Sequence, residues 1–590
     1  MKDPARTLLG EIEREVAGLP GASLAPPAST DASARFAGVM GAAAPPGLAA
    51  FLASHDGGAL GPDVKLFSLD EAARRRQRPA RTAGPVEWPA GLWPVMERGG
   101  RRFALDAQDA SADGEWPVVE VGDRGVDRMG TSFLRFVHVV CAELGAGGSV
   151  EGAAAVALGE ERCRRDPGHA DHWLDLAELL EHAGREAEID GVLASALRAS
   201  TPPTPALLLA VGMRAARAGD WESALRGFSD AIALEPIGAR DDDARLDAAA
   251  LVFVLASERG DTAAAAEAKR VLGPAVAATV SFWRSEALTG AASDAPTVAG
   301  ELAQRIVLAL EPADPDVPRL RAHAGSADMR AALRRLRSAR EALDQGRAIE
   351  AAREARAALA TPEVAELGAA HAVLAECLNA VRDRGAIEAA SRAVAINPLL
   401  VDGWRELGDA HLEADALRDA ETAFRRVVAM DPTYGLGFAK LAQVLLEEGR
   451  TLEALEAITE AGERGGDPFF IAAIRGDIYA EMERHTEAAE AYDEALDIEP
   501  EDHWALHQAA IEHCHAGNPS RASALFEAAL EHDGDGCHQT LVDYADHLRK
   551  LGRIGDAVKL YRRAVAAVPG EPDWKQALKD AERELLAAPN

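Results

Sequence analysis

The chain has 590 residues, too many for one hydrophobic core, so the sequence predicts several domains or a repeat array. Hydrophobic residues make up 48%, which excludes a globally disordered chain. A net charge of −33, from 63 basic and 96 acidic side chains, excludes nucleic acid as a partner of the whole chain. The same charge favours a basic protein partner, although it would equally keep a large helical surface soluble.

Cysteine spacing and the N-terminal sequence bear on the compartment. The five cysteines lie far apart without a CxxC pair, which indicates a reducing environment rather than a disulfide framework. Charged residues run through the N-terminal segment, where a signal peptide would be apolar. The uncharged stretch 36–54 is broken by Pro45, Pro46 and several glycines, so no membrane helix is expected. We therefore expect a cytoplasmic protein that does not contact a membrane.

The sequence before residue 150 differs from the rest in composition and has no repeat. Residues 1–30 are expected to form an N-terminal helix and a linker, and residues 31–148 a small α+β domain. Two helices are expected at 34–40 and 48–54, followed by strands at 64–67, 102–105 and 116–121. A closing amphipathic helix is expected at 132–144. Gly145–Gly148 has the composition of a linker to the next part of the chain.

Short motifs in this domain resemble a known family. Pro45-Pro46-Gly47-Leu48-Ala49-Ala50-Phe51-Leu52 leads into the turn Asp56-Gly57-Gly58, and it is followed by Leu66-Phe67-Ser68-Leu69, Arg102-Phe103-Ala104-Leu105-Asp106 and Thr131-Ser132-Phe133-Leu134-Arg135-Phe136. This order is similar to the SUKH superfamily over residues 31–145. That superfamily includes a fungal cell-wall-synthesis regulator and many bacterial toxin-immunity proteins. It usually has Asn where this chain has Asp56. The resemblance implies a domain that binds another protein, often a toxin, and does not catalyse a reaction.

Residues 160–312 are predicted to form pairs of helices with a worn repeat pattern. Two units carry it, with Trp173, Leu176, Ala177, Gly184, Leu193 and Ala196 in one, and Val211, Gly212, Gly219, Ala224, Phe228, Ala231 and Pro236 in the other. Pairs near 244–275 and 279–312 are more degenerate. The sequence 311–318 is rich in proline, and we expect a joint over 313–331 between two helical blocks.

Residues 332–571 repeat with a regular period. Residues that end a helix recur every 34 positions and then after 35, at Pro398, Pro432, Gly466, Pro500, Gly534 and Pro569. Twelve positions before each of them stands an alanine: Ala386, Ala420, Ala454, Ala488, Ala522 and Ala557. Eight positions before, most units carry a large residue: Phe424, Ile458, Tyr492, Phe526 and Tyr561. Small residues at fixed positions let two helices pack closely, and a proline ends the second helix.

This pattern resembles the tetratricopeptide repeat (TPR) family, most fully in the unit with Trp404, Leu407, Gly408 and His411. The resemblance implies a mainly α chain, a TPR-type solenoid of about nine or ten helical hairpins preceded by the small α+β domain. The charged run 572–590 is expected to be a C-terminal capping helix.

In this family the first helix of each hairpin lines a groove, which implies partner-binding residues there. The candidates are Arg405, Asp409, Phe470, Asp477, Trp504 and His507. Phe470 and Trp504 are not packing positions of the repeat, so they could form an apolar floor between acidic walls. Alternatively, these rings pack on neighbouring hairpins or at a contact between two copies of the chain. Chaperone-tail binders of the family have Lys and Asn where this chain has Arg405 and Asp409, so recognition of chaperone tails is not expected.

One group of histidines and cysteines could suggest a metal: His503, His507, His513, Cys514, His515, His532, Cys537 and His538. His503 and His507 are four apart and would share a helix face, but a zinc site needs three or four converging ligands. We favour surface and inter-helix histidines and expect no metal and no cofactor. No nucleotide-binding or hydrolase motif is present. An enzyme in the first domain that uses Asp106, Asp109, Asp123 or Asp127 is the remaining catalytic alternative.

The sequence therefore predicts a non-catalytic bacterial adaptor. Its SUKH-like head would bind one protein, and its TPR solenoid would bind another protein or a second copy of itself. An immunity or regulatory role with a basic partner is the leading interpretation. The alternative is a general assembly scaffold without any link to toxins.

Overall fold

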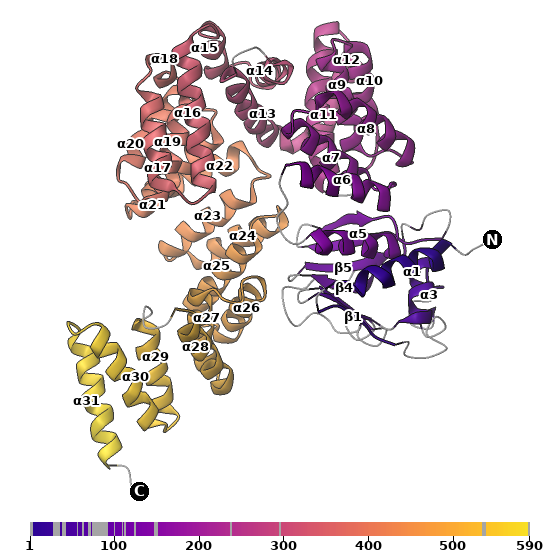
Figure 1. Cartoon of the computed structure of the whole chain (residues 1–590). Coiled ribbons are helices and arrows are strands. Elements are labelled where there is room, and N and C mark those ends of the chain that lie inside the picture. The colour runs from indigo at the N-terminus through magenta and orange to yellow at the C-terminus, as the bar shows by residue number, and fades with distance from the viewer. Residues whose placement is uncertain are drawn as a thin grey trace. The chain divides into compact units, whose positions relative to one another are not determined.

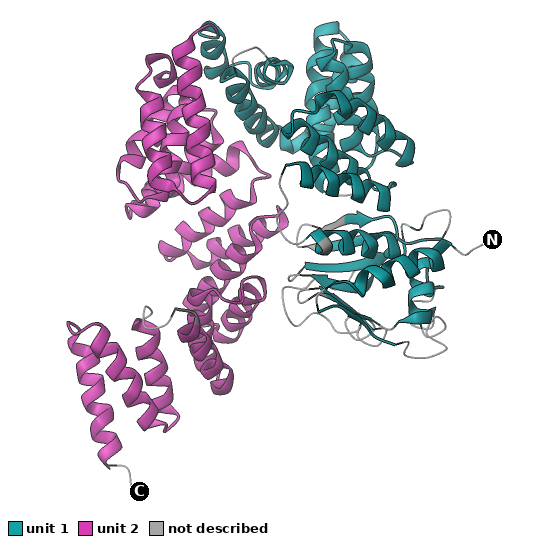
Figure 2. Cartoon of the chain, viewed as in Figure 1, with its two compact units in different colours: residues 1–80, 86–324 teal, residues 81–85, 325–590 magenta. Residues whose placement is uncertain are grey.

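The computed structural model describes residues 4–19, 21–26, 36–37, 43–55, 57–61, 64–68, 72, 92–98, 101–108, 110, 114–122, 125–146, 152–236, 239–293, 297–533 and 538–587. Two compact units divide the chain and are described separately (Figure 2). Unit 1 comprises residues 1–80 and 86–324, and unit 2 comprises residues 81–85 and 325–590. Helices form most of both units (Figure 1), which confirms the predicted fold class.

Unit 1 begins with an antiparallel sheet whose seven strands lie side by side in chain order. The strands are β1 (Ser23–Leu24), β2 (Gly58–Gly61), β3 (Val64–Leu66), β4 (Leu92–Arg98), β5 (Arg101–Asp106), β6 (Val118–Gly122) and β7 (Gly125–Gly130). Side chains alternate between the two faces of a strand. Phe103 and Leu105 of β5 therefore join the main core of the domain, while Ala104 between them joins a small cluster on the other face. Three of the strands lie where the sequence predicted them.

Three helices contribute to that main core: α1 (Pro4–Val16), α3 (Pro46–Ser54) and α5 (Phe133–Ala146). Ile12, Phe51 and Val137 are their most deeply buried side chains in the core, at 0%, 2% and 0% exposure. Helix α3 begins at a proline, which suits the first turn of a helix because its missing N–H would be unpaired there. The predicted helix 34–40 and Asp56 of the predicted turn lie largely outside the described residues, which include only Phe36 and Ala37 of that helix.

The rest of unit 1 consists of helices. These are α6 (Ala153–Arg165), α7 (Ala170–His182), α8 (Glu186–Ala199), α9 (Pro205–Arg217), α10 (Trp221–Ala233), α11 (Ala239–Arg259), α12 (Thr262–Leu272), a 3₁₀ turn η1 (Gly273–Ala275), α13 (Val276–Ala291), α14 (Val298–Leu310) and α15 (Asp316–Ala322). Successive helices pack in pairs from α7 with α8 to α13 with α14. Side chains of Thr204, Asp220, Asp261 and Thr297 accept a hydrogen bond from the first turn of the following helix, which explains where these helices begin.

A buried carboxylate, Asp166, joins the head to the helices of unit 1. Asp166 is 0% exposed and accepts hydrogen bonds from the backbone N–H of Thr131, at 2.8 Å, and from its hydroxyl. The neighbouring Arg165 donates to Glu15 of α1 at 2.7 Å and to the carbonyl oxygen of His138 at 2.6 Å. The predicted linker at 145–148 therefore does not set the head apart, because these bonds hold it to α6 within one unit.

Two histidines beside this carboxylate make unit 1 sensitive to acid. His169 and His172 are 7% and 8% exposed, and their ring centroids lie 4.5 Å apart. Burial lowers the pKa of both to about 4, against about 6.5 in an unfolded chain. The folded chain therefore favours neutral imidazoles, so this contribution to stability is complete above pH 6.5 and is lost as the pH falls towards 4. We expect the free energy of unfolding to drop by about 3 kcal/mol for the first of the two protons.

Denaturant unfolding at pH 7 and pH 4.5 checks this expectation. A His169→Gln/His172→Gln variant should lose less stability between the two pH values than the wild type. His182→Gln is the matched control, because His182 is an exposed histidine of the same helix. If the double variant and the control show the same pH dependence, the buried pair does not cause the sensitivity.

The predicted joint at 313–331 contains a short helix. Helix α15 occupies 316–322 and packs on α13 and α14, with Val317 and Leu320 buried. The boundary between the two units falls at 324 and 325, inside the predicted segment. Proline residues in this segment are therefore compatible with an ordered turn and a short helix.

Unit 2 is a continuous series of helices. These are α16 (Ala327–Asp344), α17 (Ala348–Leu359), α18 (Pro362–Ala365), α19 (Gly368–Ala380), α20 (Gly385–Ile396), α21 (Val401–Glu413), α22 (Leu417–Met430), α23 (Gly435–Glu447), α24 (Thr451–Glu463), α25 (Pro468–Glu481), α26 (His485–Ile498), α27 (His503–His515), α28 (Pro519–Asp533), α29 (His538–Lys550), α30 (Ile554–Ala567) and α31 (Pro572–Ala587). The pairs are α16/α17, α19/α20, α21/α22, α23/α24, α25/α26, α27/α28 and α29/α30, and α31 packs on α30.

In the pairs α21/α22 and α25/α26, the close approach of the two helices depends on a glycine. A Cβ atom on Gly408 of α21 would lie 2.7 Å from the Phe424 ring of α22, and one on Gly476 of α25 would lie 2.6 Å from the Tyr492 ring of α26. These rings are 0% and 2% exposed. The large residue of the repeat therefore packs against the glycine of its own pair on one side and against the next pair on the other.

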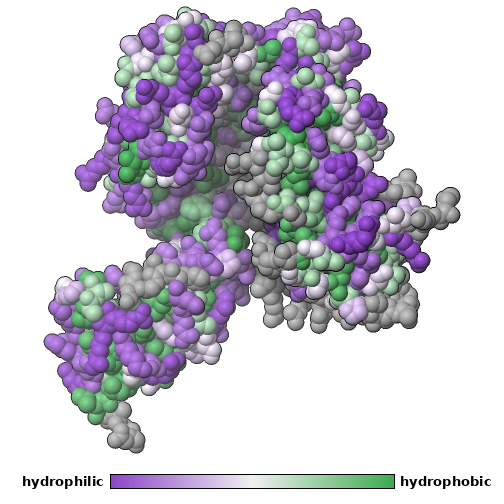
Figure 3. Space-filling model, viewed as in Figure 1, coloured by the Kyte–Doolittle hydropathy of each residue, from purple (hydrophilic) through white to green (hydrophobic). Residues whose placement is uncertain are grey.

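Surface hydrophobic residues are scattered. Figure 3 shows hydrophilic residues over much of the viewed face of each unit, with hydrophobic residues between them. Exposed large hydrophobic side chains include Phe282, Ile349, Leu452 and Leu586, each on a different helix. Among the described residues, no helix has the length and apolar character needed to cross a membrane.

Candidate functional site

The candidate residues lie on the first helices of three pairs in unit 2. Arg405 and Asp409 are on α21, Phe470 and Asp477 on α25, and Trp504 and His507 on α27. We call this set, together with Lys440 of α23, the first-helix row. Each of its side chains is partly exposed.

An ionic cluster forms the first part of the row. Arg405 contacts the carboxylate of Glu406 at 2.5 Å and that of Asp409 at 3.6 Å. Lys440 crosses from the next pair, with its Nζ 3.1 Å from Asp409 Oδ1. The side chains of Arg405, Asp409 and Lys440 are 19%, 17% and 25% exposed, so the cluster is partly shielded from water but can be reached by a ligand.

Glu406 lies beneath this cluster with a side-chain exposure of 3%. Its Oε2 accepts a hydrogen bond from Asn379 of α19 at 2.7 Å. Burial raises the pKa of the Glu406 carboxyl to about 7, and the opposing effect of Arg405 limits this shift. Two buried polar atoms of α21 and α23, Arg405 Nε and Gln443 Oε1, have no hydrogen-bond partner within the described structure. Unpaired buried polar atoms are costly, so a polar ligand at this place would be favoured.

Two aromatic groups form the rest of the row. Lys440 Nζ lies 5.3 Å from the centroid of the Phe470 ring, a distance at which a cation is attracted to the ring face. The Tyr492 hydroxyl donates to Asp477 at 2.5 Å, and the ring of Trp504 meets Tyr492 edge-on with centroids 5.9 Å apart. Burial raises the pKa of Asp477 to about 6.

The structure thus divides the predicted residues into local groups. Arg405, Asp409 and Phe470 are linked through Lys440, and Asp477 and Trp504 are linked through Tyr492. His507 is separate, with its Nε2 2.9 Å from Asp543 of α29. Phe470 and Trp504 both pack partly on neighbouring helices, as the alternative interpretation expected, and both keep an exposed part.

Sequence reasoning missed Glu406, Lys440, Tyr492 and Asp543. Glu406 and Lys440 occupy the sixth position of their units, which the predicted groove positions skipped. An acidic residue in one unit and a basic residue at the same position of the next unit could have indicated a charged contact between the two units. Tyr492 was counted as a packing residue, although its hydroxyl reaches Asp477.

The histidine group does not converge on one point. His513 contacts Asp493 at 3.0 Å and His507 contacts Asp543, while His503 is exposed. The side chains of His532 and Cys537 lie outside the described part of the chain. His503 and His507 therefore do not form the metal-binding pair that their spacing allows.

The catalytic alternatives have little support in the described geometry. Asp106 accepts the backbone N–H of Gln108 at 2.8 Å, as in a simple turn. Asp109 and Asp123 lie outside the described residues, as does the side chain of Asp127. In unit 2, Cys514 Sγ lies 3.0 Å from His547 Nδ1, but burial raises the pKa of this thiol to about 11. The thiol therefore stays protonated at neutral pH and is a poor nucleophile.

Stacked helix pairs with a polar and aromatic row on their first helices define a class of helical-repeat proteins. Residues 406–514 match the family model "Tetratricopeptide repeat-like domain", and residues 508–572 match "Tetratricopeptide repeat". Residues 406–572 therefore carry TPR-type repeats. The matches lie within unit 2, so the resemblance of residues 31–145 to the SUKH superfamily stays a prediction.

Several solved structures are similar at low identity. YrrB, described as a TPR protein with an unusual peptide-binding site, is 16% identical and covers 33% of this chain and 99% of its own, with a TM-score of 0.29. The Cut9-Hcn1 hetero-tetramer of APC/C is 15% identical over 73% of this chain and 87% of its own, with a TM-score of 0.36. PilF of Pseudomonas aeruginosa is 15% identical over 37% of this chain and 99% of its own, with a TM-score of 0.33. No curated protein gives a significant sequence match.

Proposed function

We propose that the chain is a non-catalytic adaptor whose first-helix row binds an extended, basic segment of a partner protein. TPR proteins mediate protein–protein interactions, and the TPR match over residues 406–514 includes every residue of this row except Arg405. The observation that carries the proposal is the ionic and aromatic surface that runs from Arg405 to Phe470, with unpaired buried atoms at Arg405 and Gln443.

Acidic side chains on α25 and α29, at one end of the row and beside it, favour a basic ligand. Asp409 pairs with Lys440, and Asp477 accepts a hydrogen bond from the Tyr492 hydroxyl. Asp543 of α29 lies beside the row and contacts His507 and Gln539. The whole chain has a net charge of −33, which adds long-range attraction for a cationic segment. Partly exposed aromatic rings can anchor the apolar parts of the same segment.

A Phe470→Ala/Trp504→Ala variant tests the row. Removal of both rings should weaken binding of a purified partner by more than about tenfold, because aromatic anchors commonly contribute at least 2 kcal/mol to an interface. The partner is first isolated with the full-length chain, and its dissociation constant is then measured by calorimetry. We also expect the affinity to fall as the salt concentration is raised from about 50 to about 300 mM, because salt screens the attraction between opposite charges.

Phe282→Ala is the matched control, since Phe282 is an exposed phenylalanine of unit 1, outside the row. The control should bind the partner like the wild type. Equal affinity of the double variant and the control would contradict a role of the row. An affinity that does not change with salt would contradict the basic character of the partner.

The head provides a second proposed binding surface, with an immunity or regulatory role in a cytoplasmic compartment. The motifs from Pro45 to Phe136 support the binding role, and the free thiols of Cys141, Cys163 and Cys377 support a reducing compartment. A general scaffold, which can also associate with itself, is the alternative. A partner that still binds the Phe470→Ala/Trp504→Ala chain and proves to be a basic toxin would favour the immunity role.

A further inference from the structure

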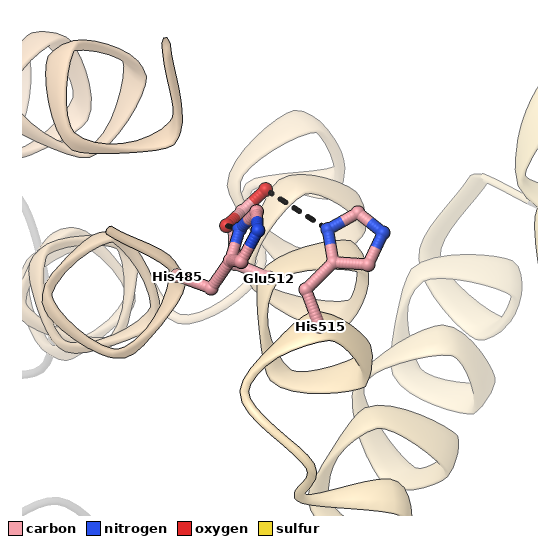
Figure 4. Close-up of side chains that lie close together, drawn as sticks. All are labelled: His485, Glu512 and His515. Atoms are coloured by element: carbon pink, nitrogen blue, oxygen red, sulfur yellow. Dashed lines mark hydrogen bonds and ion pairs between the residues drawn. The ribbon is translucent and has the colours of Figure 1, made fainter. Parts of the chain in front are cut away.

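Three potential ligand atoms for a metal meet between α26 and α27. His485 begins α26, while Glu512 and His515 are in the last turn of α27. His485 Nδ1 lies 2.8 Å from Glu512 Oε2, and His515 Nδ1 lies 3.8 Å from Glu512 Oε1. Figure 4 shows the two imidazole rings facing the carboxylate. One ligand atom from each of these three side chains lies within 4.8 Å of the other two. Among the described residues, no other group of three His, Cys, Asp or Glu side chains meets this condition.

The Glu512 carboxylate of this group is buried, and its contacts only partly replace the water that it loses on burial. The Glu512 side chain is 8% exposed, against 35% for His485 and 48% for His515. Within the described part of the chain, no lysine or arginine forms an ion pair with Glu512, whose ionic partners are the two imidazoles. Contacts with these imidazoles offset the loss of water from a buried carboxylate only in part. A cation between the three side chains would compensate it fully.

The spacing suits a tetrahedral ion. Zinc bonds to imidazole nitrogen and carboxylate oxygen are about 2.1 Å long, which places two ligand atoms of a tetrahedron about 3.4 Å apart. The contacts of 2.8 and 3.8 Å run to the two different oxygens of Glu512, and one ligand atom from each of the three side chains lies within 4.8 Å of the others. Side-chain rotations would bring these three atoms to the tetrahedral spacing. Two imidazoles and one carboxylate are ligands that zinc and similar divalent transition metals accept, whereas calcium and magnesium prefer oxygen alone.

We propose that His485, Glu512 and His515 bind one zinc-class divalent ion. A fourth position is open to water because His515 is half exposed. His485 belongs to the pair α25/α26, and the other two ligands belong to α27/α28. The ion therefore joins two successive helix pairs and fixes the angle between them. This site is independent of the partner-binding row, because it uses none of its residues.

Titration of the untagged, metal-stripped full-length chain with ZnCl₂ by calorimetry tests the proposal, with Co²⁺ absorption as a second readout of tetrahedral coordination. His515→Ala is the main variant, because an exposed side chain can be removed without loss of the fold. We expect it to weaken binding of one ion per chain by more than about 100-fold, since even residues that only support a ligand change metal affinity 10- to 100-fold. Glu512→Gln should have the same effect.

His503→Ala is the matched control, because it removes an exposed histidine from the same helix. The control should bind Zn²⁺ with the affinity of the wild type, and Zn²⁺ should raise its melting temperature as it raises that of the wild type. His515→Ala should show no such rise. If His515→Ala and His503→Ala bind Zn²⁺ equally, or if Co²⁺ gives only the spectrum of an octahedral ion, binding is adventitious and the proposal is wrong.

Discussion

Arg284→Ala is expected to lower the free energy of unfolding of unit 1 by about 3–5 kcal/mol, the cost of breaking a buried ion pair from one side. Arg284 of α13 is 4% exposed and its Nε donates to Asp314 at 3.0 Å, while Nη2 contacts Glu311 at 2.6 Å. Asp314 is 2% exposed and also accepts the backbone N–H groups of Asp316 and Val317. Without the guanidinium, a carboxylate would stay buried without its cation.

Arg305→Ala gives the matched control for this prediction. Arg305 pairs with Glu258, whose side chain is 51% exposed, so its loss should cost less than about 1 kcal/mol. Urea unfolding of both variants, with hydrogen exchange of the peptides from 276 to 322, measures the difference and locates it. Equal stability of the two variants would show that the buried pair does not order the segment before α15.

Phe424→Ala should have an effect of similar size in unit 2. The ring is 0% exposed and lies against Gly408, so its removal leaves a cavity where the two helices of a pair meet. Loss of a buried phenylalanine side chain commonly costs about 3–5 kcal/mol. Each pair contacts only its neighbours, so hydrogen exchange should accelerate most in α21, α22 and α23. Exchange that rises equally along the whole unit would contradict this local effect.

A second substitution makes the test specific. A Cβ atom at Gly408 would lie 2.7 Å from the ring, so Gly408→Ala should destabilise the wild type by about 1–3 kcal/mol. In the Phe424→Ala background the methyl group enters the cavity, and its cost should disappear. The two changes should therefore be strongly non-additive. Leu452→Ala, which removes an exposed leucine, should change the stability little.

The helix pairs of unit 2 could be predicted because their cause is local and periodic. Small residues such as Ala420 and helix-ending residues such as Pro432 recur with the repeat, and the structure places them in the predicted roles. The TPR fold follows from that pattern. In the head, β3, β5 and β6 have strong apolar sequences and were found. The two-residue strand β1 has no such signal, because it exists only through its pairing with β2.

The candidate site was predictable only in part. The helix that carries each residue followed from the repeat, but its contacts depend on which side chain of the next pair lies opposite. Asp409 meets Lys440, and Trp504 meets Tyr492, through packing between pairs that has no local sequence signal. The order of the joint could not be predicted for the same reason, since Arg284 reaches Asp314 from a different helix.

Lys440 has a mechanical consequence. An array of stacked helix pairs can change its curvature, because each pair is held only by its neighbours. Lys440 of α23 contacts Asp409 in the pair before it and the Phe470 ring in the pair after it, so one side chain spans three successive pairs. Such a tie stiffens this stretch against bending. A cationic ligand side chain that displaced Lys440 from Asp409 would break one of the two contacts, soften this stretch and let its curvature change.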